Sequence, residues 1–333
     1  MQVTRRVFDS SRKEHKIVAN IYTPTIPTNT QALPKNSKPV TLFLTHGTGF
    51  HKELWEPVLH QLFAHRSPAW TITSAVAIDM CSHGDSAVLN RATLADERRA
   101  SWFTHARDVL RVLDQLHQEG GRRSFVGIGH SWGAGVLLLA ESLSPMTFAC
   151  LLPTEAVLFL RYMEDEKYCG MIERRKWLFA DEQEARDYFT KHKLFKAWDQ
   201  RCLELHIRHG LENNTTGEQG EGGVLALKCR PQSEAAVYRG ADYASLYTTL
   251  RLWRVRCPTG FLVGRKSLQS PEAYVRKITE GMADRRLEVV EGAGHLLVLE
   301  KPDAAAEHYA RFLDDMVPRS DARREIDFGR AKL

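Results

Sequence analysis

Short hydrophobic runs alternate along most of the chain with segments in which hydrophobic residues recur every three to four positions. The runs have the length of strands that are buried on both faces of a parallel sheet, and the segments between them have the periodicity of amphipathic helices. We therefore expect an α/β fold with a mostly parallel, doubly wound sheet. The expected strands are 39–46, 73–79, 124–130, 148–155, 258–264 and 286–290, and the expected helices are 52–65, 105–118, 131–143, 271–282 and 302–316.

Two regions depart from this alternation. Residues 3–10 and 16–24 are rich in β-branched and aromatic side chains and flank a polar turn, which predicts an antiparallel hairpin. Residues 161–250 are charged and helical in pattern, with a glycine-rich turn at 213–223. We interpret residues 161–250 as a helical cap that is inserted into a single α/β domain, rather than as a second independent domain.

On this interpretation two parts of the chain, residues 1–160 and residues 251–317, form the core of the domain. Pro318 is a helix breaker, so residues 318–333 are expected to form an accessible tail.

The last three residues of this tail resemble a known targeting signal. Ala331, Lys332 and Leu333 resemble the Ser-Lys-Leu tripeptide that the peroxisomal import receptor recognises. The tripeptide predicts a peroxisomal location, with the import receptor as a partner.

The composition narrows the class of protein. Of the 333 residues, 43% are hydrophobic and 26% are charged, which is typical of a globular domain and excludes a disordered chain. The net charge of +5 comes from short basic clusters without a nucleic-acid motif, so no nucleic-acid partner is expected. No N-terminal stretch resembles a secretion signal, and no hydrophobic run is long enough to span a bilayer. We expect a soluble intracellular protein without an integral membrane segment; a homodimer is compatible with the sequence, which does not fix the oligomeric state.

The cysteines and histidines give no sign of a metal site. Six cysteines are scattered singly, which argues for a reducing compartment and against a disulfide framework. His206 and His209 have the spacing of two ligands on one helix face, but the HExxH pattern of metalloproteases is absent. A solvated pair, or one that packs the cap, explains these residues better, and we expect neither a metal nor another cofactor.

A nucleophilic serine stands between an expected strand and an expected helix. Gly129, His130, Ser131, Trp132 and Gly133 form a G-x-S-x-G pattern at the point where residues 124–130 meet residues 131–143. In a nucleophile elbow the glycines leave room for a strained turn that exposes the serine Oγ at the start of the helix. This position makes Ser131 the candidate nucleophile.

A dinucleotide-binding loop is the competing interpretation. Gly127, Gly129 and Gly133 resemble a loosened glycine fingerprint, and Glu155 follows at the distance of a ribose-binding acid. However, Trp132 occupies the third position of strict GxGxxG, and the fingerprint normally opens the first βαβ unit. The nucleotide interpretation is therefore disfavoured.

His295 is the candidate general base. It follows the last expected strand in a loop that contains Gly292 and Gly294, 164 residues after Ser131. The chain order serine, acid, histidine gives the base this position. A neutral His295 would take the Ser131 proton during attack and return it to the leaving group.

The oxyanion hole requires backbone N–H groups. One donor is expected from Trp132, the residue after the nucleophile, and the other from the loop His46-Gly47-Thr48-Gly49-Phe50 after an expected strand. Thr48 is the preferred donor in this loop, and Gly49 is the next choice.

These motifs together resemble the α/β-hydrolase superfamily. The similarity is carried by HGTGF (46–50), DMCSHGDS (79–86), GHSWGAG (129–135) and GAGHLLVLEKP (292–302). A finer likeness to fungal peroxisomal acyl-CoA hydrolases, and to hydrolases of host-selective-toxin biosynthesis in secondary metabolism, is carried by HGDSAVLN, FKAWDQRCLELHIRHGL, LKCRPQSEAAVY and the terminal AKL. The resemblance implies an α/β-hydrolase fold with an inserted cap.

The resemblance also exposes a gap at the catalytic acid. In many α/β hydrolases an Asp lies three residues after the glycine that ends the penultimate strand, and here this residue is Ser267. Glu155, at the end of the expected strand 148–155, is our replacement, because adjacent strand ends in a parallel sheet lie close together. In the fungal acyl-CoA hydrolases that this chain resembles, the catalytic acid also lies at this strand end, but it is an Asp. Glu272 and Asp199 are the alternatives.

The expected activity is that of a serine hydrolase with a Ser131-His295-Glu155 triad, acting through an acyl-enzyme. The resemblance and the terminal tripeptide favour an acyl-CoA thioester, or a related ester of a lipid-like or polyketide acid, as substrate. A carboxylic-ester hydrolase or lipase, an acyltransferase and a non-catalytic binding protein of the same fold are the alternatives. Eight cap residues could line the substrate path or only pack the cap: Tyr162, Met163, Trp177, Phe179, Tyr188, Phe189, Phe195 and Trp198.

Overall fold

The computed structural model describes residues 1–25, 37–94, 98–121, 123–160, 166–214 and 225–330. In these residues eight strands form one sheet in the order β1-β2-β4-β3-β5-β6-β10-β11. All neighbouring pairs from β4 to β11 are parallel, and β2 runs antiparallel to both of its neighbours. The predicted fold class and the N-terminal hairpin are thereby confirmed. The strands are β1 (Gln2–Asp9), β2 (Lys16–Thr23), β3 (Lys38–Thr45), β4 (Trp70–Ile78), β5 (Phe125–His130), β6 (Cys150–Thr154), β10 (Thr259–Gly264) and β11 (Arg285–Val290).

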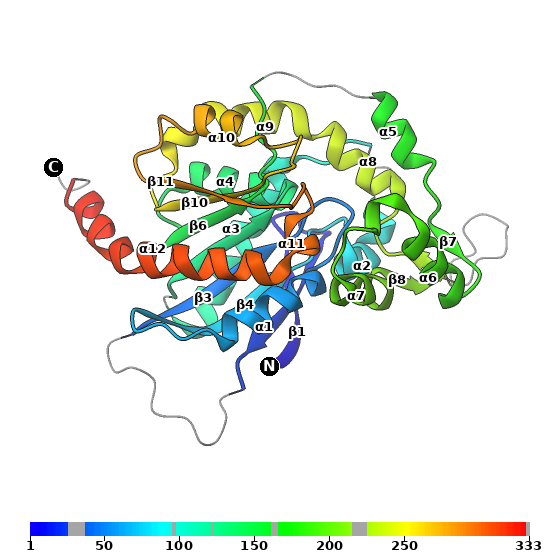
Figure 1. The fold of residues 1–333 in the computed structure, drawn as a ribbon, viewed down its shortest axis with the longest axis horizontal. Coiled ribbons are helices and arrows are strands. Elements are labelled where there is room, and N and C mark those ends of the chain that lie inside the picture. The colour runs from blue at the N-terminus through cyan, green and yellow to red at the C-terminus, as the bar shows by residue number, and fades with distance from the viewer. Residues whose placement is uncertain (26–36, 95–97, 122, 161–165, 215–224, 331–333) are drawn as a thin grey trace.

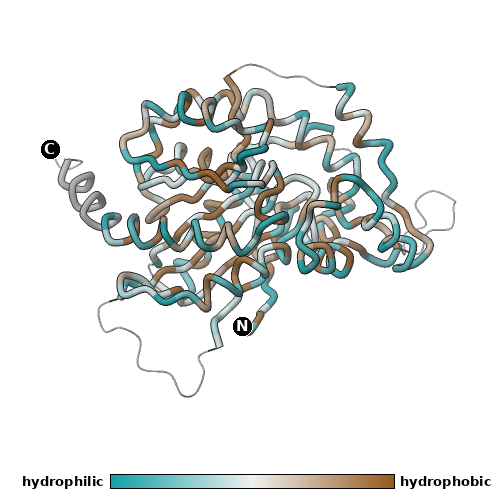
Figure 2. Tube along the Cα trace, in the orientation of Figure 1, coloured by the Kyte–Doolittle hydropathy of each residue, from teal (hydrophilic) through white to brown (hydrophobic). Residues whose placement is uncertain are grey.

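Helices cover both faces of this sheet (Figure 1), because adjacent residues of a strand point to opposite faces. Leu42 and Leu44 of β3 join a hydrophobic cluster with α1 and α12, whereas Phe43 joins a second cluster with α3 and α4. Figure 2 shows hydrophobic residues gathered in the central strands. The helices of the core are α1 (Glu56–Ala64), α2 (Gly84–Leu94), α3 (Trp102–Gly120), α4 (Trp132–Leu143), α10 (Glu272–Ile278), α11 (Leu297–Glu300) and α12 (Pro302–Arg330), with the 3₁₀ helix η1 (Lys52–Trp55).

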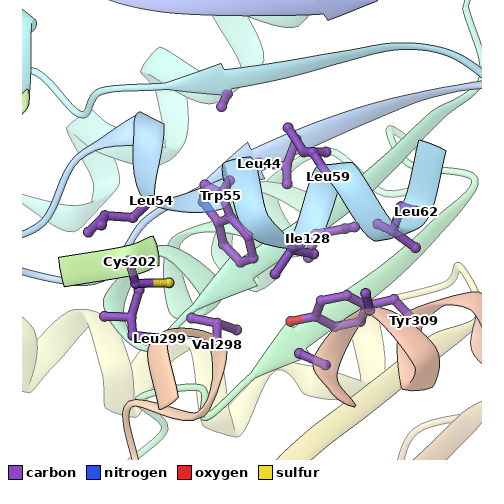
Figure 3. Packing of buried hydrophobic residues seen from close by; sticks show 14 of the residues in the cluster. Leu44, Leu54, Trp55, Leu59, Leu62, Ile128, Cys202, Val298, Leu299 and Tyr309 are labelled. Atoms are coloured by element: carbon purple, nitrogen blue, oxygen red, sulfur yellow. The ribbon is translucent and has the colours of Figure 1, made fainter. Parts of the chain in front are cut away.

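The cluster on the α12 face also ties the insertion to the core. Figure 3 shows Trp55 near Ile128 of β5 and Tyr309 of α12, all of them buried. Cys202 of the insertion lies beside Leu299 of α11 in the same cluster. Each large side chain that is fully buried in this way contributes about 1.5–3 kcal/mol to folding.

The insertion joins the sheet between β6 and β10, and its first elements lie at one end of the molecule (Figure 1). It contains a small antiparallel sheet of order β7-β9-β8 in addition to the expected helices. Its last helix, α9, packs on the core through Ala241 and Ala244. The division of the chain at residues 160 and 250 stays a prediction. The elements are α5 (Glu166–Glu173), β7 (Leu178–Phe179), α6 (Glu182–Lys191), η2 (Lys193–Phe195), α7 (Gln200–Gly210), β8 (Leu211–Asn213), β9 (Leu225–Leu227), α8 (Pro231–Arg239), α9 (Ala241–Leu250) and η3 (Leu252–Arg254).

The structure differs from the sequence-based expectations in two elements. The α12 helix continues through Pro318, where we expected it to stop. Proline removes one backbone hydrogen bond, but its fixed φ is compatible with a helix. The α2 helix was not among the expected helices; its first residue, Gly84, has a φ of 51°.

Candidate active site

Ser131 lies in the turn between β5 and α4 and has a φ of 52° and a ψ of −117°. This backbone conformation is strained for a residue with a side chain, and such strain is typical of functional turns. The turn needs its two flanking glycines. A Cβ on Gly129 would lie 2.7 Å from the backbone of Ala134, and a Cβ on Gly133 would lie 2.5 Å from the carbonyl oxygen of His46. The tight turn presents the Ser131 Oγ beside the N-terminus of α4.

His295 lies between β11 and α11, with its Nε2 2.9 Å from the Ser131 Oγ. His130, the residue before Ser131, donates a hydrogen bond from its Nε2 to the His295 carbonyl oxygen at 2.9 Å. Burial lowers the pKa of His130 to about 3, so this ring is neutral at pH 7. The turn that carries Ser131 therefore also holds the backbone of His295. No local pattern could have predicted this contact, because it joins residues 165 positions apart.

Glu155 follows β6 directly and is fully buried. Its Oε2 accepts a hydrogen bond from the His295 Nδ1 at 2.9 Å, which leaves the unprotonated Nε2 to accept the Ser131 proton. Its Oε1 accepts from the Gly264 N–H at 2.6 Å, and the Ser267 hydroxyl donates to Oε2. The serine at the usual acid position thus donates a hydrogen bond to the carboxylate on the neighbouring strand.

The alternative acids are engaged elsewhere. Glu272 forms ion pairs with Arg265 and Arg276. Asp199 caps the N-terminus of α7 and pairs with Arg201. Among the three carboxylates that the sequence suggested, the structure brings Glu155 to His295.

The loop 46–50 follows β3 and lies beside Ser131. His46 donates from Nδ1 to the Gly47 carbonyl oxygen at 2.8 Å and accepts the Met80 N–H at Nε2 at 3.2 Å, so this buried ring fixes the loop. The Gly49 N–H donates to the Nε2 of His83 at 2.9 Å. Within the part of the chain that the structure describes, the Thr48 N–H has no such partner.

The Trp132 N–H belongs to the first turn of α4, where helical N–H groups lack intrahelical partners. Thr48 and Trp132 both line the same cavity as Ser131. The arrangement favours these two amides over Gly49 as donors to an oxyanion.

A cavity of about 490 Å³ opens at Ser131 and His295, a volume suited to a small-molecule substrate. Of the eight cap residues named from the sequence, Tyr188, Phe189 and Phe195 line it. Trp177, Phe179 and Trp198 belong to the hydrophobic packing of the insertion instead. Tyr162 and Met163 lie outside the described residues.

Two charged side chains of the insertion, Arg175 and Glu234, line the cavity and form an ion pair with each other. His206 also lines the cavity and stacks on His51, with ring centroids 5.5 Å apart and an interplanar angle of 6°. His209 lies 6.4 Å from the same His51 ring. The pair 206 and 209 therefore takes part in aromatic packing, as expected.

One group of three side chains in the described residues could hold a metal ion. It consists of Cys81, His105 and Asp108, whose ligand atoms lie within 4.8 Å of one another. All three are buried, and the Asp108 Oδ1 already accepts hydrogen bonds from Ser10 and Ser11. None of the three lines the cavity at Ser131.

The terminal residues Ala331, Lys332 and Leu333 lie outside the described residues. None of the described helices is long and hydrophobic enough to cross a bilayer.

Comparisons with known proteins agree with this fold. The model of the Alpha/beta hydrolase family matches residues 42–308. The Saccharomyces cerevisiae protein described as peroxisomal membrane protein LPX1 is 25% identical over 84% of this chain and 76% of its own length. A structure of this yeast protein, described as a peroxisomal alpha-beta-hydrolase, has a TM-score of 0.77 at 21% identity and covers 99% of this chain and 95% of its own.

Two further relatives act on thioesters by their descriptions. The type I acyl-CoA thioesterase mpaH' of Penicillium brevicompactum is 34% identical over 37% of this chain and 28% of its own length. The thioesterase domain from the curacin biosynthetic pathway has a TM-score of 0.66 at 17% identity, covering 94% of this chain and 100% of its own. The matched part thus spans less than a third of the Penicillium enzyme, and the likeness to the curacin domain is one of fold.

Proposed function

Because the chain belongs to the α/β-hydrolase family, we propose that it is a serine hydrolase that cleaves an acyl-CoA thioester, or a related ester of a lipid-like or polyketide acid. The observation that carries this proposal is the continuous chain of hydrogen bonds from Ser131 through His295 to Glu155, which ends in a cavity of ligand size. The thioesterases among the relatives support the choice of a thioester.

In the first half of the proposed reaction, the Ser131 Oγ attacks the substrate carbonyl carbon while His295 Nε2 takes the hydroxyl proton. The carbonyl oxygen becomes negative, and the N–H groups of Thr48 and Trp132 donate hydrogen bonds to it. When the tetrahedral intermediate collapses, His295 gives its proton to the departing thiolate or alkoxide. The acyl group remains on Ser131 as an ester.

In the second half, His295 takes a proton from a water molecule that attacks this ester. When the second tetrahedral intermediate collapses, His295 returns this proton to the Ser131 Oγ and the acid is released. Glu155 stabilises the imidazolium that forms in both halves and holds the Nδ1 proton in place. Its own position is set by the donors Gly264 and Ser267. These side-chain and backbone groups suffice for acyl transfer to water.

We also propose a peroxisomal location. The terminal tripeptide Ala331-Lys332-Leu333 supports it, and so does the description of the yeast relative as peroxisomal. A peroxisomal site would bring the enzyme together with acyl-CoA esters, and a role in fungal secondary metabolism fits the sequence likeness described above.

The test is mass spectrometry of wild-type and Ser131→Ala protein incubated with a panel of acyl-CoA esters and matched oxygen esters. We expect wild type to release free CoA and Ser131→Ala to release none. A fluorophosphonate probe should label wild type and leave Ser131→Ala unlabelled. If wild type is labelled but cleaves only oxygen esters, the enzyme is a carboxylic-ester hydrolase. If wild type is not labelled at all, the proposal of a serine hydrolase is wrong.

A further inference from the structure

An ion pair from the insertion lies against the loop that supplies the proposed oxyanion donor. Glu234 of α8 has a side chain that is only 6% exposed. Its carboxylate lies so close to Gly49 that a Cβ on this glycine would be 3.0–3.1 Å from the carboxylate atoms. Arg175, just after α5, donates from Nη1 to the Glu234 Oε1 at 3.2 Å and from Nη2 to Oε2. Both side chains line the cavity that Ser131 lines.

A carboxylate in this position is a problem for the reaction. The residue next to Gly49 is Thr48, whose N–H is proposed to hold the oxygen that becomes negative. Charges of the same sign that are a few ångströms apart in a partly dry site repel each other strongly. An unpaired Glu234 would therefore oppose the charge that the oxyanion hole stabilises. An arginine with two parallel hydrogen bonds is well suited to cancel such a charge.

We propose that Arg175 is a positioning residue that neutralises the Glu234 carboxylate and holds it in place. The carboxylate then does not oppose the negative charge that forms in the oxyanion hole. This inference rests on the proposed function. Glu234 in turn packs against Gly49, whose φ of 83° belongs to the turn that presents Thr48. Arg175 acts through Glu234 and does not need to touch the substrate. The charge balance between Arg175 and Glu234 thereby affects the rate of the chemical step.

A second ion pair in the same part of the fold serves as a matched control. Arg239 of α8 pairs with Glu173 of α5 at 2.7 Å and with Glu166 at 3.0 Å. This group joins the same two segments as Arg175 and Glu234, but none of its members lines the cavity. If ion pairs between α5 and α8 matter only for holding the cap together, both groups should behave alike.

The experiment compares five proteins: wild type, Arg175→Met, Glu234→Gln, the double variant Arg175→Met/Glu234→Gln, and Arg239→Met. Hydrolysis of one acyl substrate and the rate of Ser131 labelling by a fluorophosphonate are measured for each, together with the melting temperature. We expect Arg175→Met to lose roughly ten- to hundredfold in kcat with a small change in KM. The double variant should return to within about fivefold of wild type, because no charge is left to oppose the oxyanion. Arg239→Met should stay within about twofold of wild type, since surface pairs contribute little.

The conservative variant Arg175→Lys should keep most of the activity, because it keeps the charge. Glu234→Gln alone should be at least as fast as wild type, and this variant tests the idea even if Arg175→Met does not fold. A double variant that is no faster than Arg175→Met at an unchanged melting temperature would overturn the proposal and indicate a direct contact of Arg175 with substrate. A tenfold slower Glu234→Gln would also overturn it.

A different result is expected if the proposed function itself is wrong. In that case wild type itself would neither hydrolyse the substrate nor be labelled. Where wild type is labelled but the right substrate has not been found, the labelling rates of the five proteins give the same comparison.

Discussion

At the scale of single residues, the proposed mechanism divides between Ser267 and Glu155 a task that one aspartate performs in many α/β hydrolases. Glu155 provides the charge from the end of β6, and Ser267 donates a hydrogen bond to it from the loop after β10. The extra methylene of glutamate is accommodated because the carboxylate is held from three directions, by His295, Gly264 and Ser267. A carboxylate with this many donors needs no further partner.

This arrangement predicts that substitutions of Glu155 and of Ser267 lower kcat by different factors. Glu155→Gln should lower kcat by about 10³- to 10⁴-fold, because an amide cannot stabilise the imidazolium and favours the wrong tautomer of His295. Ser267→Ala removes one hydrogen bond to a charged group and should cost about tenfold. Steady-state kinetics on the best acyl substrate checks both values. Glu272→Gln is the control and should be unaffected, since Glu272 pairs with Arg265 and Arg276. If Glu272→Gln were the slow variant, our choice of acid would be wrong.

The sequence allowed these candidate residues to be named because local pattern and chain order are enough for them. Ser131 stands in a glycine pattern between a strand and a helix, and His295 follows the last strand. The contacts of His130 with His295 and of Arg175 with Glu234 could not be predicted in the same way. They join residues that are 165 and 59 positions apart, and no short-range pattern encodes such a distance.

At the scale of the elements, the elbow between β5 and α4 depends on close contact with the end of β3. Gly133→Ala would push a Cβ to 2.5 Å from the His46 carbonyl oxygen, which belongs to the loop with Thr48. We expect this substitution to lower kcat by about a hundredfold, because an oxyanion donor is displaced.

Gly170 in α5 gives a matched control for the elbow. A Cβ there would meet only the Arg174 side chain at 3.4 Å. Gly170→Ala should therefore leave kcat unchanged and stabilise the protein by about 0.5–1 kcal/mol, because alanine favours a helix. Kinetics and thermal melting of both variants test the expectation. Equal effects of the two substitutions on kcat would contradict it.

The elements that the hydrophobic pattern predicted correctly are those with a continuous hydrophobic run or a long amphipathic period. The strands β3 to β6 and the helices α3 and α4 are of this kind, since they are buried by the sheet or against it. The α2 helix was missed because its residues 84–94 alternate small, polar and charged side chains without a clear hydrophobic stripe. The strands β7, β8 and β9 are two or three residues long, too short for any period to appear.

At the scale of the whole molecule, several histidines buried in the described core are neutral at pH 7. Burial lowers the pKa of His46 and His130 to about 3 and that of His105 to about 4. Burial also lowers the pKa of His83 and His206 well below the usual value. Unfolding returns all five rings to water, where they bind protons near pH 6.5.

The protein should therefore lose stability as the pH falls. Below about pH 6.5 the unfolded chain binds more protons than the folded chain, so the free energy of unfolding decreases towards the pH at which the buried rings titrate. Glu141 opposes this, because burial raises its pKa to about 7, so that it favours the folded state as the pH falls from 7. Burial also raises the pKa of Glu56 and Asp79, which acts with Glu141, and lowers the pKa of His60 and His209, which acts with the five rings. The histidines outweigh the carboxyls, and we expect a net loss of about 2 kcal/mol between pH 7 and pH 6.

Urea denaturation at the two pH values measures this loss. His65→Gln, a change at a half-exposed ring near the surface, should leave the difference between the two pH values as it is. A stability that stays constant or rises on acidification would show that the buried rings are not neutral.

The exchange of the acid between β6 and β10 also bears on how such enzymes diverge. Glu155 follows β6 and accepts from the Nδ1 of His295, and Ser267, in the loop after the neighbouring strand β10, donates to the same carboxylate oxygen. An ancestor with a carboxylate at both ends would have kept an acid at His295 throughout, so either one could then drift to a neutral residue. Because both ends lie at the same edge of the sheet, either strand can carry the acid without a change in the order of the strands.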